Sequence, residues 1–412
     1  MTEVEIPILA TPREPLPTIS ADAAALSRVV TSLLSGSGPI AIDAERASGF
    51  RYSSRAYLIQ LRRRGSGTHL IDPIDIEDFS ELASAINSTT WILHSATQDL
   101  PCLGDLGLKP ASLFDTEVAA KLLGKERVGL AALIEAEFEL RLEKEHSAAD
   151  WSTRPLPTEW LNYAALDVEL LVELREAQIA ELNEKSRMTW AEEEFAYLAE
   201  WQKPLANGEP WRRTSGLHQL KTSRQLGIVQ ALWQERDRLA QSRDKAPGRI
   251  FSDAAMIDVA TKDLKSARDV FRLETLRNRS HKAHADLIWN VRNRVMQLPE
   301  NELPQRTKNP GAIPPPKAWA EKMPAAAKRW ALIRPALNEL ATSLTIAAEV
   351  LISPEPVRQI CARPGDSLLA EESMAEFFRQ YNVRSWQIEL TAPAIKEAIA
   401  QLTVSELTEQ DQ

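Results

Sequence analysis

The stretch that decides the fold is Pro39-Ile40-Ala41-Ile42-Asp43-Ala44-Glu45, a short apolar run that ends in two acidic residues. The run follows Gly38 and is partly β-branched, so it predicts a buried strand. Side chains two apart in a strand point to the same face. Asp43 and Glu45 are therefore expected to project together from the end of this strand. Because an unpaired buried carboxylate is costly, we expect a cation between them.

Two further blocks of sequence carry the remaining acidic residues, HSATQD at 94–99 and YAALD at 163–167. The apolar residues 91–93 predict a strand that leads into the first block. Residues 160–173 predict a helix, because apolar residues recur there at helical spacing. Tyr163 and Asp167 are four apart on that helix and share one face.

The four acidic side chains form a set of hard oxygen ligands: Asp43, Glu45, Asp99 and Asp167. Carboxylate oxygens favour Mg²⁺ or Mn²⁺. Four carboxylates around one phosphate are what a two-metal phosphodiester hydrolase requires, with the ions roughly 3.5–4 Å apart. The sequence therefore predicts a site for two divalent metal ions, Mg²⁺ or Mn²⁺.

The order D-x-E, H-x-x-x-x-D and Y-x-x-x-D resembles the DEDD superfamily of 3′→5′ exonucleases, in its tyrosine-bearing branch. The segments RAYLIQL at 55–61 and DWSTRPL at 150–156 resemble the ribonuclease D family in particular. This resemblance covers residues 38 to 180, approximately. It implies an α/β ribonuclease H-like exonuclease domain, with a mixed sheet and flanking helices.

The resemblance also implies roles for the motif residues. Asp43, Glu45, Asp99 and Asp167 would be the catalytic metal ligands, with Asp43 bridging both ions. Tyr163 is expected to orient the attacking water, because a phenol with a pKa near ~10 is a poor base.

Three other residues are candidate contacts to the substrate. His94 stands at a motif position, with a capping or packing role as the alternative. Arg154 is expected to contact a phosphate or to form a surface ion pair. Gln60, on the neighbouring predicted strand, is expected to touch the terminal nucleotide.

The chain has a formal net charge of −9, but the charge is unevenly distributed. Residues 211–294 carry 18 Lys and Arg against 9 Asp and Glu, a local excess of nine positive charges. A basic module attached to an acidic catalytic body suits a nuclease, because the module can meet the phosphate backbone.

The composition also bears on the compartment. The two cysteines, Cys102 and Cys361, lie far apart without a zinc-binding pattern, which fits a reducing cytoplasm. The acidic N-terminus differs from a secretory signal, and no apolar run is long enough to span a membrane. We therefore expect a cytoplasmic protein without a membrane partner.

Changes in composition predict six segments along the chain. They are a loose leader with a first helix (1–36), the exonuclease domain (37–200), a linker (201–213), a helical domain (214–298), a proline-rich linker (299–317) and a second helical domain (318–412). The linkers are assigned from their prolines and from Asn207-Gly208.

The first helical domain resembles, over residues 228–260, the helicase-and-RNase-D C-terminal (HRDC) domain, a small helical bundle that commonly binds nucleic acid. The second domain repeats parts of this pattern 100 residues later: Leu232-Trp233 corresponds to Leu332-Ile333. We expect two all-α HRDC-like bundles, the second one degenerate. RNA contact is assigned to the first bundle, through Arg236, Arg243, Lys245 and Arg249, and a packing role to the second. The alternative is that the basic helix face is only solvated.

These features together predict a monomeric 3′→5′ exoribonuclease that releases 5′-mononucleotides. Its expected partner is RNA with a single-stranded 3′ end, in particular transfer RNA precursors and other small structured RNAs. Two alternatives stay open. One is a 3′→5′ DNA exonuclease, since the acidic site is compatible with either sugar. The other is a catalytically silent RNA-binding protein.

Overall fold

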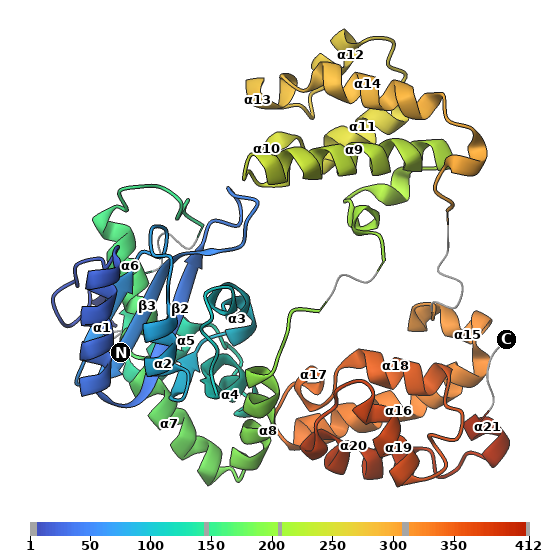
Figure 1. Ribbon diagram of the computed structural model, residues 1–412. Coiled ribbons are helices and arrows are strands. Elements are labelled where there is room, and N and C mark those ends of the chain that lie inside the picture. Colours follow the sequence, from blue (N-terminus) through green and yellow to red (C-terminus); the bar gives the residue numbers. More distant parts are fainter. Residues whose placement is uncertain (1–5, 144–147, 205–207, 307–312, 409–412) are drawn as a thin grey trace, which may run out of the picture.

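The computed structural model describes residues 6–143, 148–204, 208–306 and 313–408. Parts of the two predicted linkers, residues 205–207 and 307–312, lie outside the described residues. Figure 1 shows three lobes: an N-terminal α/β domain and two helical bundles. Within the described ranges, no helix combines the length and the apolar character that crossing a bilayer would need.

The α/β domain contains a five-stranded mixed sheet in the order β4-β3-β2-β5-β6. Its strands are β2 (Ser37–Arg46), β3 (Ala56–Arg64), β4 (Gly67–Ile71), β5 (Thr90–Leu93) and β6 (Ser112–Asp115). The pairs β2–β3 and β3–β4 are antiparallel, whereas β2–β5 and β5–β6 are parallel. The predicted mixed sheet and the strand through Ile40 and Ile42 are therefore confirmed.

Eight helices belong to the described part of this domain. They are α1 (Ala23–Ser35), α2 (Ser80–Ile86), α3 (Leu100–Gly104), α4 (Thr116–Leu122), α5 (Leu130–Phe138), α6 (Thr158–Glu169), α7 (Leu171–Glu184) and α8 (Met188–Ala199). A helix was predicted over 160–173, but the chain breaks at Leu170, which separates α6 from α7.

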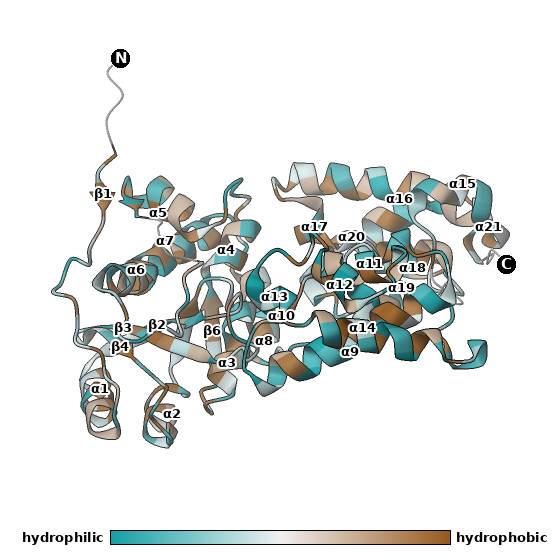
Figure 2. Cartoon of the chain, turned by 90° about the horizontal axis from the view of Figure 1, so that it is seen from above, coloured by the Kyte–Doolittle hydropathy of each residue, from teal (hydrophilic) through white to brown (hydrophobic). Residues whose placement is uncertain are grey.

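The sheet is buried on both faces, which explains why β2 begins as a continuous apolar run. Ile40 and Ile42 pack in the main core, whereas Leu58 packs with Trp151 and Ala164 in a smaller core beneath α6. Figure 2 shows hydrophobic residues along the strands, and alternating hydrophilic and hydrophobic residues along the helices. Because α6 covers the same strands that carry the acidic residues, it can bring Asp167 to them.

The N-terminal segment differs from the predicted loose leader. Strand β1 (Ile8–Leu9) pairs in parallel with β7 (Arg141–Leu142), and the backbone of Ser20 bonds to Leu70 and Asp72 beside β4. Helix α1 is capped by Asp22, whose carboxylate accepts from the Ala25 N–H at 2.7 Å, and it buries Leu26 and Leu33 in the main core. The prediction was wrong because the partners that anchor this segment lie far along the chain, on β4 and β7.

The first bundle comprises α9 (Ser223–Ser242), α10 (Pro247–Ile250), α11 (Asp253–Thr261), α12 (Ala267–Phe271), α13 (Arg279–Lys282) and α14 (Ala285–Met296). These helices enclose a hydrophobic core of their own. Trp211 and Leu303, which lie in the predicted linkers, are buried in this core. Both linkers are therefore shorter than predicted, since an apolar side chain within a linker can still join the neighbouring core.

The second bundle comprises α15 (Trp319–Lys322), α16 (Pro324–Ser343), α17 (Ala348–Leu351), α18 (Pro354–Ala362), α19 (Glu371–Arg379), α20 (Ser385–Ala398) and α21 (Val404–Thr408). Its buried residues form one continuous core with those of the α/β domain. Figure 1 shows α8 lying beside this bundle and away from the lobe formed by α9–α14.

Candidate active site

Three of the predicted acidic ligands meet at one point beside the sheet. Asp43 and Glu45 come from β2, and Asp167 comes from α6, which packs across β2 and β3. One carboxylate oxygen from each of the three residues lies within 4.8 Å of the others. The strand period of two and the helical covering of the sheet therefore produce the predicted convergence.

The electrostatics of this cluster favour a bound cation. Burial raises the pKa of Asp43 to about 6, although a hydrogen bond from the Ala44 backbone and the charge of Arg46 oppose the rise. Burial and the charges of neighbouring carboxylates raise the pKa values of Glu45 and Asp167 well above their ordinary range. Without a cation, mutual repulsion would keep protons on these groups. A divalent ion with oxygen ligands would replace those protons, so the donor set fits such an ion.

Asp99 lies next to this cluster but outside the group of three. Burial and the charge of Asp43 raise its pKa well above the ordinary range. Its Oδ1 lies 3.7 Å from the guanidinium of Arg46, which directly follows Glu45 on the strand. The structure thus brings all four predicted carboxylates into one electrostatic unit, with Arg46 as the nearby cation.

Asp115 fixes the turn that carries Asp99 to the site. Its carboxylate accepts from the N–H groups of Ser95 (3.3 Å) and Ala96 (2.7 Å), and it also caps α4. Ser95 has a φ of 62°, in the left-handed region, and such a conformation persists only where surrounding bonds hold it. Asp115 therefore holds this turn and the start of α4 in place.

Tyr163 stands on the same face of α6 as Asp167, to which its side chain is hydrogen-bonded. Burial and the nearby Asp167, Glu45 and Asp43 carboxylates raise the pKa of the phenol. Tyr163 therefore stays protonated near neutral pH and can donate a hydrogen bond. Trp151, from the DWSTRPL segment, lies behind the ring with a centroid separation of 6.3 Å.

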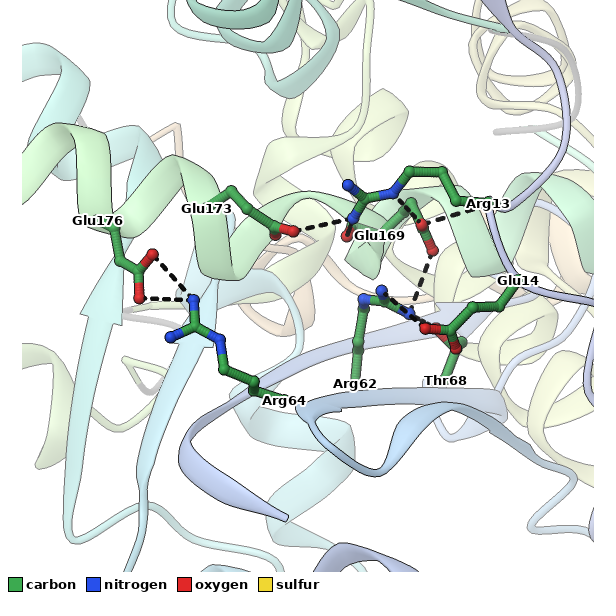
Figure 3. A network of polar contacts seen from close by, with 8 residues as sticks. All are labelled: Arg13, Glu14, Arg62, Arg64, Thr68, Glu169, Glu173 and Glu176. Atoms are coloured by element: carbon green, nitrogen blue, oxygen red, sulfur yellow. Dashed lines mark hydrogen bonds and ion pairs between the residues drawn. The ribbon is translucent and has the colours of Figure 1, made fainter.

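The C-terminal end of α6 is held by an ion-pair network around the buried Glu169 (Figure 3). Glu169, two residues after Asp167, is fully buried and accepts from Arg13 Nε at 2.7 Å. Arg62 of β3 lies 3.4 Å from its other carboxylate oxygen, and Arg13 also reaches Glu173 on α7. The N-terminal segment, the sheet and the catalytic helix are thereby joined beside the site.

Two residues that were predicted to contact the substrate, Arg154 and His94, form hydrogen bonds within the protein instead. Each N–H of the Arg154 guanidinium has an acceptor: the two carboxylate oxygens of Asp72 and the carbonyl oxygens of Tyr57, Trp151 and Thr153. The phosphate contact is therefore not supported, and the ion-pair alternative holds. His94 Nδ1 is 2.9 Å from the Thr116 hydroxyl, and burial lowers its pKa. His94 thus joins the start of α4 rather than the acidic cluster.

Gln60 is placed beneath the site rather than on its surface. It pairs with Asp43 across β2 and β3, and its side chain is 0% exposed. Among the described residues, neither its amide oxygen nor its amide nitrogen has a hydrogen-bond partner. The predicted contact with the terminal nucleotide is not supported: Gln60 shares the sheet face of Asp43 as its cross-strand partner, but its side chain is completely covered there.

The four basic residues predicted to contact RNA divide into two kinds. Arg236 is 6% exposed and pairs with Asp253 at 2.7 Å, so its assignment to RNA contact is wrong: it holds α9 to α11. Arg243 and Lys245 are exposed. Arg249 is exposed as well, but its Nε donates to the Gly49 carbonyl of the exonuclease domain at 2.8 Å.

The comparisons with known proteins agree with this arrangement. Residues 17–182 match the 3′-5′ exonuclease family, residues 225–291 the HRDC domain and residues 312–399 the 3′ to 5′ exonuclease C-terminal domain. Ribonuclease D of Zymomonas mobilis is 32% identical over 301 residues, 71% of this chain and 75% of that protein. The chain belongs to the ribonuclease D family.

Solved structures extend this likeness over most of the chain. A crystal structure of a protein from Bifidobacterium adolescentis covers 96% of this chain and all of its own, at 35% identity and a TM-score of 0.87. The crystal structure of Escherichia coli RNase D, an exoribonuclease involved in structured RNA processing, covers 93% of this chain and 99% of its own, at 25% identity and a TM-score of 0.66.

Family and site together make this protein a metal-dependent 3′→5′ exoribonuclease. The second bundle matches the exonuclease C-terminal family, and the HRDC family matches only the first bundle. The prediction of two HRDC bundles is thus confirmed for one.

Two positioning elements escaped the sequence reasoning: the cation Arg46 and the Glu169 network. Arg46 directly follows the D-x-E motif, and Glu169 follows Asp167 by two positions. A charged residue beside a motif was the available signal. The partners Asp99, Arg13 and Arg62 are distant in sequence, so only the fold reveals their contacts.

Proposed function

We propose that this member of the ribonuclease D family trims the single-stranded 3′ ends of transfer RNA precursors and other small structured RNAs, releasing 5′-mononucleotides. The observation that carries the proposal is the convergence of three carboxylates within 4.8 Å beside a protonated tyrosine, in a chain that also has a basic HRDC bundle. The acidic site suits phosphodiester hydrolysis. The basic bundle suits the folded body of an RNA, whose backbone it can meet through exposed cations.

We infer the following roles for the catalytic residues. Asp43, Glu45, Asp99 and Asp167 would hold two divalent ions, Mg²⁺ or Mn²⁺. The chemistry that such ions would supply is a lowered pKa of the attacking water and stabilisation of negative charge on the leaving 3′ oxygen. Tyr163 would orient the attacking water rather than take its proton, because its raised pKa keeps the phenol protonated. Arg46 favours the charged form of Asp99 and would help to orient it toward the ions.

We also propose that the second bundle is a degenerate HRDC repeat, and that the chain acts as a monomer. Helices α16, α17 and α18 have the same lengths as α9, α10 and α11, and each begins 101 residues after its counterpart. In this division the exonuclease unit runs from β1 through α8. The HRDC unit then extends from Trp211 to Leu303, and the second bundle begins near Trp319.

A degradation assay tests the function. A 3′-extended transfer RNA precursor and a DNA strand of equal length are incubated with Mg²⁺ or Mn²⁺. Wild type is expected to shorten the RNA one nucleotide at a time. Asp43→Ala should reduce the rate about 100-fold or more, since ion-held charge stabilisation contributes several kcal/mol. The matched control is Asp263→Asn, an exposed acid in the HRDC bundle.

The outcomes separate the alternatives. RNA-selective shortening that is lost in Asp43→Ala supports the proposal. Equal or faster loss of DNA would identify a DNA exonuclease. Metal-dependent RNA binding without shortening would identify a silent binding protein, and retained activity in Asp43→Ala would contradict the assigned ligands.

A further inference from the structure

A cavity of about 500 Å³ lies between the exonuclease domain and the HRDC bundle. The β2–β3 connection lines one side with Phe50 and Arg51, and the HRDC bundle lines the other with Lys245, Arg249 and His281. Figure 1 shows this connection reaching from the sheet toward α10. The cavity therefore has one wall from each domain.

The exonuclease wall of the cavity is built from segments that also build the catalytic centre. The β2–β3 connection leaves β2 directly after Glu45 and Arg46. Asp150, which also lines the cavity, precedes Trp151, and the Trp151 ring packs 6.3 Å from Tyr163. An RNA strand whose last nucleotide occupies the catalytic centre would thus have this cavity close to its preceding nucleotides.

Hydrogen bonds across the junction hold the two walls in place. The Ala246 N–H donates to the Phe50 carbonyl at 3.0 Å, and Arg249 Nε donates to the Gly49 carbonyl at 2.8 Å. The Arg249 guanidinium also lies over the Phe50 ring, 3.9 Å from its centroid. The cavity is therefore preformed, which reduces the entropic cost of ordering a ligand there.

The charges that line the cavity favour an anion. Arg51, Lys245 and Arg249 supply three cations against the single carboxylate of Asp150. Asp150 accepts bonds from the backbone and hydroxyl of Ser152, so part of its hydrogen-bonding capacity is already used. Within the described ranges, Lys245 has no carboxylate at ion-pair distance. The phosphate of a nucleic acid is a fitting ligand for this wall.

His281 adds an uncharged hydrogen-bonding group to the lining of the cavity. It is only 8% exposed although it lines the cavity, and it lies against the Gly248 backbone. Its buried Nδ1 has no hydrogen-bond partner among the described residues. Burial lowers the pKa of the imidazole, so this nitrogen belongs to a neutral ring. A hydroxyl group can satisfy it in either tautomer, because a hydroxyl both donates and accepts.

We propose that this cavity is a ribonucleotide subsite: it binds one nucleotide upstream of the scissile end, with its phosphate at Lys245 and Arg51 and its ribose 2′-hydroxyl at His281 Nδ1. The proposal rests on the exoribonuclease function and deepens it. It assigns part of the preference for RNA over DNA to the junction of the two domains, rather than to the acidic centre, since the 2′-hydroxyl distinguishes the two sugars.

The test is a 2′-deoxy scan. Single-stranded 12-nucleotide RNAs, each with one 2′-deoxy position, are bound to the full chain in Ca²⁺, and affinity is read by fluorescence anisotropy. In wild type, one upstream position should weaken binding about 2- to 10-fold, the effect of one lost hydrogen bond. His281→Phe should abolish that dependence. His281→Asn should retain it in part, because the amide places a polar atom near the position of Nδ1.

The phosphate contact has its own readout. Lys245→Ala should reduce the slope of log affinity against log salt by about 0.7, the contribution of one phosphate on a single strand. The matched control is Lys265→Ala in the same bundle, whose side chain is 82% exposed and lies outside the cavity. An equal change in both variants would overturn the phosphate assignment.

The outcomes also distinguish this proposal from the function on which it rests. A flat scan in wild type, or a position effect that persists in His281→Phe, overturns the subsite even if wild type shortens RNA normally. Failure of wild type to shorten any RNA would instead contradict the exoribonuclease function. If His281→Phe fails to fold, judged by its thermal melt, the reduced position effect in His281→Asn decides.

Discussion

The two helical bundles follow one plan but are attached to the exonuclease domain in different ways. In each, a 20-residue helix is followed by a four-residue helix and a nine-residue helix. The HRDC bundle encloses a separate core, whereas the core of the second bundle is continuous with that of the exonuclease domain. The order and lengths of the helices therefore do not determine how a bundle is attached to the exonuclease domain.

The contacts of the second bundle are apolar at their centre. Trp386 of α20 stacks on Trp190 of α8, with ring centroids 4.8 Å apart. Its indole N–H donates to Glu194, and Arg384 pairs with the same carboxylate at 3.0 Å. Large aromatic side chains dominate interface energies, so this bundle is a fixed support for α8.

The contacts of the HRDC bundle are mostly polar and come from one connection. The Tyr52 hydroxyl donates to Asp237, and the N–H groups of Tyr52 and Ser53 donate to Asp244. An interface of this kind contributes less than an apolar one and is salt-sensitive. The HRDC bundle can thus face a ligand while the second bundle supports the fold.

The largest expected effect is at the apolar junction. Trp386→Ala should lower the free energy of unfolding of the exonuclease domain by about 3–5 kcal/mol, through the lost burial and the cavity left behind. Calorimetry of the full chain measures the effect. Trp211→Ala, an equally buried change in the HRDC core, should destabilise only the HRDC transition. Equal shifts of both transitions would show that the two attachments do not differ.

A smaller effect is expected within the HRDC bundle. Arg236→Ala removes a buried donor to Asp253 and to the Phe251 carbonyl. The HRDC transition should lose about 1.5–3 kcal/mol, the range for hydrogen bonds to charged groups, and the exonuclease transition should stay in place. A change in RNA salt dependence at unchanged stability would restore Arg236 as an RNA contact.

Arg236, which was predicted to contact RNA and is buried, shows which features the sequence could predict. Its place in the basic segment 211–294 predicted an exposed cation, and the exposed Arg243 fits that prediction, but burial of one arginine depends on where α11 packs. The catalytic set was accessible because its signals are local: a period of two at Asp43 and Glu45, and a spacing of four at Tyr163 and Asp167. These local rules survive folding unchanged.

The parts that escaped the sequence depend on distant partners. Arg13 lies in the N-terminal leader, and its contact with Glu169 adds to the backbone bonds that make this leader part of the catalytic domain. Gln60 looked accessible beside Asp43, yet both faces of its strand are covered. Whether a polar residue is on the surface or in the interior is set by the layers above it, which no short window of sequence contains.

Salt dependence sharpens the comparison between the bundles. Arg243→Ala with Lys245→Ala should reduce the slope of log RNA affinity against log salt by about 1.4, since each phosphate contact on a single strand contributes about 0.7. The matched pair in the second bundle is Lys322→Ala with Lys396→Ala, for which no change in slope is expected. Filter binding at several KCl concentrations measures both. Equal slopes for the two double variants would contradict the assignment of RNA contact to the HRDC bundle alone.

The smallest expected effect is at the polar junction. Tyr52→Phe removes one hydroxyl that bonds to Asp237 at 3.1 Å and leaves the ring in place against the HRDC core. Docking of the HRDC bundle should weaken by about 0.5–1.5 kcal/mol, the net worth of one hydrogen bond. Hydrogen exchange should therefore speed up in residues 49–53 and in the segment around Asp244, while α8 and α20 keep their protection. Faster exchange at α8 instead would mean that the two junctions are coupled through the exonuclease domain, and that the separation between a fixed support and a ligand-facing bundle does not hold.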